Sequence, residues 1–114
     1  TVFSSSSRMR TDLLVNNLVS KAIKEKVLIV YQGGYMRNYI HIDDVCRAFL
    51  FSLKNWTDCK NEIYNLGNDS INMNKLQLCK EINKQIPCEI IEAEYTTDPD
   101  LRNYIVSSLK FYDK

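Results

Sequence analysis

Residues 28–53, LIVYQGGYMRNYIHIDDVCRAFLFSL, decide the fold class, because two strand-like runs and a helix start follow one another within them. The first run, Val27–Tyr31, is rich in β-branched residues and is closed by a glycine pair. The second run, residues 38–42, takes its strand propensity from Tyr39, Ile40 and Ile42. Asp43 then predicts the N-cap of a helix. Strands that alternate with helices indicate an α/β class of fold.

The rest of the chain continues this alternation. Residues 4–7 are a serine tract that predicts a loop, and residues 55–61 predict a polar loop. The expected strands are 1–3, 27–31, 38–42, 63–66, 89–95 and 103–106, with a turn at 98–100. The first expected helix covers 13–23 and is capped by Thr11 or Asp12. The second begins at Asp43 and buries Val45, Ala48, Phe49 and Leu53. The third is capped by Asn74 and ended by Pro87, and the last residues predict the start of a fourth.

The composition is that of an ordinary soluble globular chain, with 45% hydrophobic and 25% charged residues among 114. A net charge of +1 without a run of Lys and Arg provides no long-range field, so we expect neither nucleic acid nor a membrane as a partner. Four irregularly spaced cysteines and one histidine predict reduced thiols instead of disulfides or a metal site. Without a secretory or membrane-spanning run, the expected location is cytoplasmic.

One block of this sequence is similar, residue by residue and in order, to a motif of a known family: Gly34, Arg37, Asn38, Tyr39, Ile40, His41, Asp44 and Ala48. The chain thereby resembles the NAD-dependent sugar-nucleotide epimerases and dehydratases, the extended short-chain dehydrogenase/reductase family. The segments MRTDLLVNNLV, EIYNLGNDSINMNKLQL and DPDLRNYIVSSLK resemble the same family in the same order. The resemblance implies the carboxyl-terminal portion of an extended Rossmann-type epimerase/dehydratase, with mixed short strands and helices.

Two motifs of that family are absent from the chain. The family holds NAD in a Gly-x-x-Gly-x-x-Gly turn and catalyses with a Tyr-x-x-x-Lys pair, whereas this chain has 3 glycines and no tyrosine with a lysine four residues later. We therefore expect residues 1–114 to be one substrate-binding fragment without catalytic residues or turnover of its own. Residues 1–3 and 62–67 are expected to belong to the edge of a missing cofactor domain. NAD is the implied cofactor of the longer protein and should bind poorly to the fragment.

The resemblance also implies which residues contact the ligands. A planar guanidinium can form paired hydrogen bonds to a diphosphate, and the family uses the arginine at the position of Arg37 in this way. The other residues implied to bind substrate are Asn16, Asn17, Leu18, Leu28, Tyr31 and Arg102, and those implied to bind the cofactor are Val2 and Phe3.

Simpler interpretations stand beside these roles. Arg37 alone reads as a surface arginine after a turn, the two asparagines as part of a solvated helix face, and Leu28 as ordinary β core. For His41 a structural hydrogen bond is favoured over a general base. The acidic pair that follows it is explained by the helix dipole.

The function expected from the resemblance is the sugar-nucleotide-binding portion of an NAD-dependent epimerase/dehydratase that acts on a nucleoside-diphosphate sugar. The alternative is a non-catalytic nucleotide-binding or interaction module related to that family. A homodimer is left open for the longer protein. The base, the sugar and the outcome of the reaction, epimerisation, dehydration or reduction, are not specified by these residues.

Overall fold

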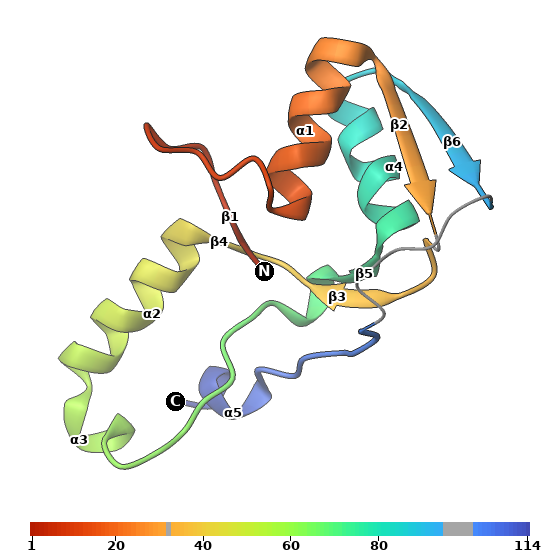
Figure 1. Cartoon of the computed structure of the whole chain (residues 1–114). Helices are drawn as coiled ribbons and strands as arrows, with labels where there is room; N and C mark the ends of the chain where they lie inside the picture. The colour runs from red at the N-terminus through yellow and green to blue at the C-terminus, as the bar shows by residue number, and fades with distance from the viewer. Residues whose placement is uncertain (32, 95–101) are drawn as a thin grey trace.

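A computed structural model describes residues 1–31, 33–94 and 102–114 and shows a mixed α/β arrangement (Figure 1). The strands are β1 (Val2–Phe3), β2 (Val27–Tyr31), β3 (Met36–Asn38), β4 (Ile40–His41), β5 (Asn72–Asn74) and β6 (Glu89–Ala93). The helices are α1 (Leu14–Glu25), α2 (Ile42–Lys54), α3 (Trp56–Cys59), the 3₁₀ turn η1 (Asp69–Ile71), α4 (Lys75–Gln85) and α5 (Leu109–Tyr112). No helix in this described part of the chain is long and apolar enough to cross a membrane.

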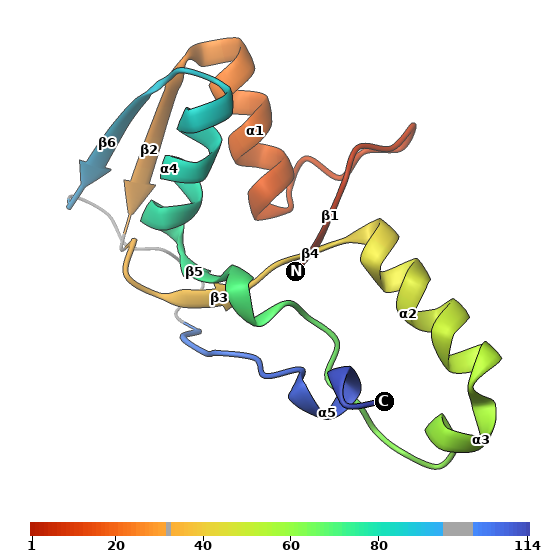
Figure 2. The ribbon, with the colours of Figure 1, turned by 180° about the vertical axis from the view of Figure 1, so that it is seen from behind.

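The packed core lies between a parallel pair of strands and two helices. β2 and β6 pair in parallel, with Val27 opposite Glu89 and Tyr31 opposite Ala93. Helices α1 and α4 lie side by side on one face of this pair (Figures 1 and 2). The buried residues of the core are Val15, Leu18, Ala22, Leu28, Val30, Tyr39, Leu78, Cys79 and Ile82. The opposite face of the pair is open, since Ile29 and Ile91 are exposed.

Helix α4 confirms the predicted cap. The Asn74 side chain accepts a hydrogen bond from the Gln77 amide at 2.8 Å, and the Gln77 side chain accepts one from the Asn74 amide at 2.8 Å. This reciprocal pair satisfies two backbone donors of the first turn. Further along the helix, burial raises the pKa of the Cys79 thiol to about 11, so this thiol stays protonated at neutral pH.

The chain changes its pairing partner at Tyr39, and this corrects the strand expected over 38–42. β3 pairs antiparallel with β5, whereas β4 pairs in parallel with β1. Ile42 is already the first residue of α2. The buried Tyr39 ring packs into the core at the point where one short ladder ends and the next begins.

Two other predicted caps are wrong. α2 is capped by His41, whose Nδ1 accepts a hydrogen bond from the Asp43 amide at 3.2 Å, so Asp43 lies in the first turn and does not cap it. This contact confirms a structural hydrogen bond for His41. α1 begins after Leu13 without a side-chain cap. Asp12 instead pairs with Arg10 at 2.6 Å, and the Thr11 carbonyl accepts a hydrogen bond from the Asn17 side chain.

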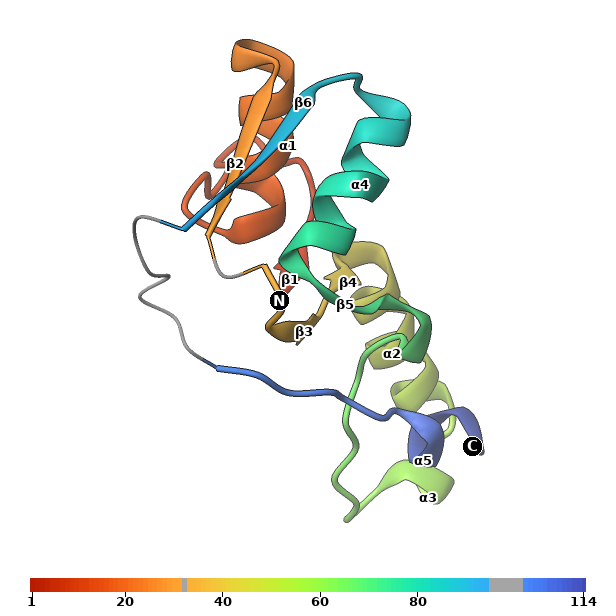
Figure 3. The same cartoon turned by 90° about the vertical axis from the view of Figure 1, so that its right-hand side faces the viewer.

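Helix α2 extends away from the core (Figure 3), and most of its apolar side chains are exposed. Ala48 is buried, but Phe49 and Leu53 are each 67% exposed, contrary to the burial expected for them. The loop expected over 55–61 contains the short helix α3. The Cα radius of gyration is 16.3 Å, compared with about 13 Å for an ordinary domain of this length.

Two expected strands are absent from the described residues. Residues 63–66 form no ladder with another strand, and Ile63 is 88% exposed. Residues 102–108, here called the C-terminal strap, also run without a ladder, and the strand expected over 103–106 is therefore wrong. Side chains of Asn72 and Asp69 hold the strap, because they bond the backbone of Val106 and Ser108. The turn expected at 98–100 and the end of the strand 89–95 lie outside the described residues.

Gly67 offers a test of the packing beneath the strap. A Cβ at this residue would collide with Asn38 Oδ1 and approach Ser108 Oγ to 3.3 Å, whereas a Cβ on Gly34 would meet nothing within 4 Å. We expect Gly67→Ala to lower the free energy of unfolding by about 1–3 kcal/mol, because overpacking forces a buried contact to shift. Gly34→Ala should stay within about 0.5 kcal/mol of the wild type. Urea unfolding of both variants measures this, and equal stabilities would contradict the packing described.

The exposed face of α2 generates a second prediction. Contiguous apolar patches favour association, so the chain should bind a hydrophobic dye and self-associate. The double change Leu50→Glu and Leu53→Lys removes two exposed leucines while it keeps helix-forming residues and the net charge. Light scattering and dye fluorescence should both fall, whereas Lys80→Gln on exposed α4 surface should leave them unchanged. A monodisperse wild-type chain without dye binding would refute this.

Candidate functional site

The candidate site is a cavity of about 340 Å³ that we call the Arg37 cavity. It lies where the start of α1, the start of α4, strand β3 and the C-terminal strap meet. Its lining residues are Thr1, Asp12, Leu13, Leu14, Asn17, Tyr35, Arg37, Tyr39, Lys75 and Arg102. The cavity therefore combines an apolar wall of leucines and tyrosines with three cationic side chains.

Arg37 is the most buried of these cations. Only 8% of the residue is exposed, because β3 lies between β5 and the strap. Its Nη1 donates a hydrogen bond to the Met36 carbonyl at 2.9 Å, and its Cζ lies 5.3 Å from the centroid of the Tyr104 ring. A buried guanidinium held by a carbonyl and a ring has a fixed direction, which favours paired hydrogen bonds to an anion.

The electrostatics of the cavity favour an anion. Burial first, and then the charge of Arg102, lower the pKa of the Thr1 ammonium below its usual value. Among the described lining residues the one carboxylate, Asp12, is already paired with Arg10 at 2.6 Å. The hydrogen bond from Arg10 lowers the pKa of Asp12, so this carboxylate is ionised and its charge is offset outside the cavity.

The first turn of α1 adds backbone donors to the same cavity. Leu13, its N-cap, makes no side-chain capping bond, and the first turn holds no acidic residue. Leu13 and Leu14 line the cavity, so the uncapped amino end of the helix opens toward it. The N–H groups of an uncapped first turn and the helix dipole both stabilise a bound anion.

The residues predicted from the sequence fall into separate groups. Arg37, Asn17 and Arg102 line the Arg37 cavity together. Leu18 and Leu28 are buried in the core, and Tyr31 lies at the end of β2 outside the cavity lining.

Asn16 is also displaced from the cavity. It is 6% exposed and donates a hydrogen bond to the Arg10 carbonyl at 3.1 Å, so the solvated helix face considered for it is wrong. Asn17 donates to the Thr11 carbonyl at 3.0 Å. Both asparagines therefore fold the preceding loop back onto α1.

Sequence reasoning missed Lys75 and the ring of Tyr104. Lys75 follows the cap of α4, and nothing in its local pattern distinguishes it from a surface lysine. It reaches the cavity because Met36 pairs with Asn74 in the β3–β5 ladder, which places the start of α4 beside Arg37. Only the antiparallel pairing could have identified it.

Two other cavities have a different character. One, about 760 Å³ between α1 and α4, contains Phe3 and His41 and has no Lys or Arg among its described lining residues. Glu81 supplies its carboxylate, so it does not suit an anion. Val2, the other residue implied to bind the cofactor, is exposed on β1.

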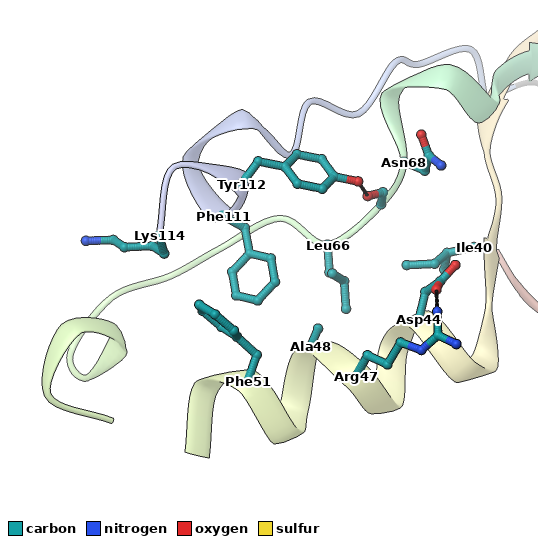
Figure 4. Close-up of a pocket in the computed structure, with 11 residues that line it drawn as sticks. Ile40, Asp44, Arg47, Ala48, Phe51, Leu66, Asn68, Phe111, Tyr112 and Lys114 are labelled. Atoms are coloured by element: carbon teal, nitrogen blue, oxygen red, sulfur yellow. Dashed lines mark hydrogen bonds and ion pairs between the residues drawn. The ribbon is translucent and has the colours of Figure 1, made fainter. Parts of the chain in front are cut away.

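The third cavity, about 390 Å³, lies between α2 and α5 (Figure 4). Its walls include the Phe51 and Phe111 rings, which lie edge to face at 5.7 Å. Arg47 in this cavity is paired with Asp44 at 3.3 Å, and the Tyr112 hydroxyl donates to the Gly67 carbonyl at 3.2 Å. Within the described residues no cluster of His, Cys, Asp and Glu could hold a metal ion. The Arg37 cavity is therefore the candidate site.

Comparison with solved structures shows the same fold in sugar-nucleotide enzymes. The chain matches a dTDP-glucose 4,6-dehydratase from Bacillus anthracis in complex with NAD at a TM-score of 0.72 and 20% identity, over 99% of this chain and 35% of that one. It matches a UDP-glucose 4-epimerase from Thermotoga maritima with UDP-glucose at 0.66 and 22%, over 88% of this chain and 32% of that one. A Thermus thermophilus UDP-glucose 4-epimerase in complex with NAD matches at 0.72 and 17%, over 98% and 37%.

The chain thus spans about a third of the length of these structures, between 32% and 37%. Residues 2–67 match the sequence profile of the NAD dependent epimerase/dehydratase family. That match covers the strand, the arginine and the helix start from which the resemblance was drawn. This chain belongs to the NAD-dependent epimerase/dehydratase family.

Proposed function

We propose that the Arg37 cavity binds the diphosphate of a nucleoside-diphosphate sugar, and that the chain is the sugar-nucleotide-binding portion of an NAD-dependent epimerase/dehydratase. The observation that carries this proposal is the convergence of Arg37, Lys75 and Arg102 on one cavity, each from a different element. A diphosphate carries enough negative charge to interact with all three. The guanidinium of Arg37 would form the paired hydrogen bonds and Lys75 would act as a point charge.

The apolar part of the cavity suits the rest of such a ligand. Leu13 and Leu14 form one wall, and Tyr35 and Tyr39 contribute aromatic rings to another. Ligand sites commonly combine apolar walls with a few directed polar groups. A sugar or a base next to the diphosphate would pack on these walls, which supports a sugar nucleotide over inorganic phosphate.

The residues of this chain do not fit NAD. Its glycines are Gly33, Gly34 and Gly67, and none of them belongs to a glycine turn after a first strand that would admit a dinucleotide pyrophosphate. Of the residues implied to touch the cofactor, Phe3 packs edge to face on His41 at 5.5 Å and Val2 is exposed. In this proposal NAD is held by other parts of a longer protein.

The proposal is tested by calorimetric titration of the 114-residue chain with UDP-glucose and dTDP-glucose. We expect Arg37→Ala to weaken binding by about 1.5–3 kcal/mol, the range for a hydrogen bond to a charged group. Arg47→Ala is the matched control, because it removes the same charge from the cavity between α2 and α5. NAD should not bind measurably to the wild-type chain or to either variant.

The possible results distinguish a specific diphosphate site from nonspecific electrostatic attraction. Uridine without a diphosphate should bind far more weakly than UDP-glucose. Equal losses in the two arginine variants would mean that only net charge matters, and an unchanged affinity in Arg37→Ala would refute the assignment.

A further inference from the structure

The ring of Tyr104 contacts Arg37 from the C-terminal strap. The Arg37 Cζ lies 5.3 Å from the ring centroid, within the range in which a cation is attracted to an aromatic face. Tyr104 is 36% exposed, so its position does not follow from burial in the core. Its neighbour in the strap, Ile105, is 69% exposed.

The backbone of the strap fixes where this ring stands. The Tyr104 amide donates to the Met36 carbonyl at 3.1 Å, and the Asn103 side chain accepts from the Met36 amide at 2.8 Å. Consecutive strap residues therefore bind both backbone polar groups of Met36, as a neighbouring strand would. Two residues further on, Asn72 bonds both backbone polar groups of Val106, at 2.8 and 3.0 Å. Tyr104 is thus anchored on both sides.

The Met36 carbonyl binds both Arg37 and Tyr104. The Met36 oxygen accepts hydrogen bonds from Arg37 Nη1 at 2.9 Å and from the Tyr104 amide at 3.1 Å. The guanidinium is held at one nitrogen by this oxygen and faces the ring, so both its position and its tilt are restricted. An arginine side chain otherwise loses much rotamer freedom when it binds a ligand, and restraint before binding reduces that cost.

We propose that Tyr104 is a positioning residue for Arg37: its ring holds the guanidinium in the direction required to bind a diphosphate. This inference rests on the proposed function of the Arg37 cavity. According to this inference, Tyr104 raises the affinity for the diphosphate through its ring and not through its hydroxyl.

The test compares Tyr104→Phe, Tyr104→Leu and Ile105→Ala in the 114-residue chain, with UDP as the probe. Tyr104→Leu should raise the Kd for UDP about threefold to tenfold, in keeping with the strength of cation–aromatic contacts. Tyr104→Phe keeps the ring and should bind like the wild type, as should Ile105→Ala from the same strap. In an Arg37→Ala background, Tyr104→Leu should cause no further loss, because the effect passes through Arg37.

A second measurement does not depend on the nucleotide. The Nε–Hε resonance of Arg37 in an NMR spectrum senses the ring current of Tyr104, so it should shift in Tyr104→Leu and stay nearly fixed in Tyr104→Phe. The backbone amide spectrum of each variant verifies that it is folded. An Arg37 resonance unmoved in folded Tyr104→Leu would overturn the inference.

The Kd values of the variants for UDP provide the remaining tests of the inference. Equal losses in the Phe and Leu variants would assign the effect to the hydroxyl and overturn the inference, and so would an unchanged Kd in Tyr104→Leu. Each of these results leaves the proposed function intact. A wild-type chain that does not bind UDP or UDP-glucose would overturn the proposed function, and the role of Tyr104 with it.

Discussion

The hydrogen bond from Asn38 Nδ2 to Asn72 Oδ1, at 3.1 Å, joins the segments on which the candidate site is built. Asn38 is 4% exposed, and its carbonyl also accepts a hydrogen bond from the Thr1 amino group at 2.7 Å. Asn72 in turn bonds both backbone polar groups of Val106. Removal of either amide would leave buried partners unsatisfied, which costs more than the bond itself contributes. This contact therefore couples the ladder that carries Arg37 to the strap, alongside the bonds of the strap to Met36 and Asp69.

Rigidity and charge come from different parts of the molecule. The layer of β2, β6, α1 and α4 supplies the packed apolar core. The cations come from its margin: Arg37 from β3, Lys75 from the first turn of α4, and Arg102 from the strap. The core and the hydrogen bonds of the strap hold these three segments together. In the proposed function, the three cationic side chains that line one cavity attract a polyanion.

Local sequence patterns predicted the helices and strands that are determined by residues close together in the sequence. The strand β2, the helix α1 and the cap of α4 at Asn74 follow from residues next to one another. The strands expected over 63–66 and 103–106 are wrong, because a strand exists only when a second one pairs with it, and the strap has one backbone bond to Met36 and otherwise bonds largely to side chains. For the site, Arg37 came from its motif, whereas Lys75 required the β3–β5 pairing, which is set by tertiary structure.

The lining of the Arg37 cavity extends in sequence from Thr1 to Arg102. Its walls therefore meet only when segments far apart in the sequence have formed their tertiary contacts, and such long-range closure is the slow part of folding. A ligand bound there would stabilise the native state against every opening that separates these walls, including the departure of either end. Ligand binding in the Arg37 cavity and cooperative unfolding of the chain would thus be thermodynamically linked. A proteolytic cut in any loop between Thr1 and Arg102 would therefore weaken ligand binding.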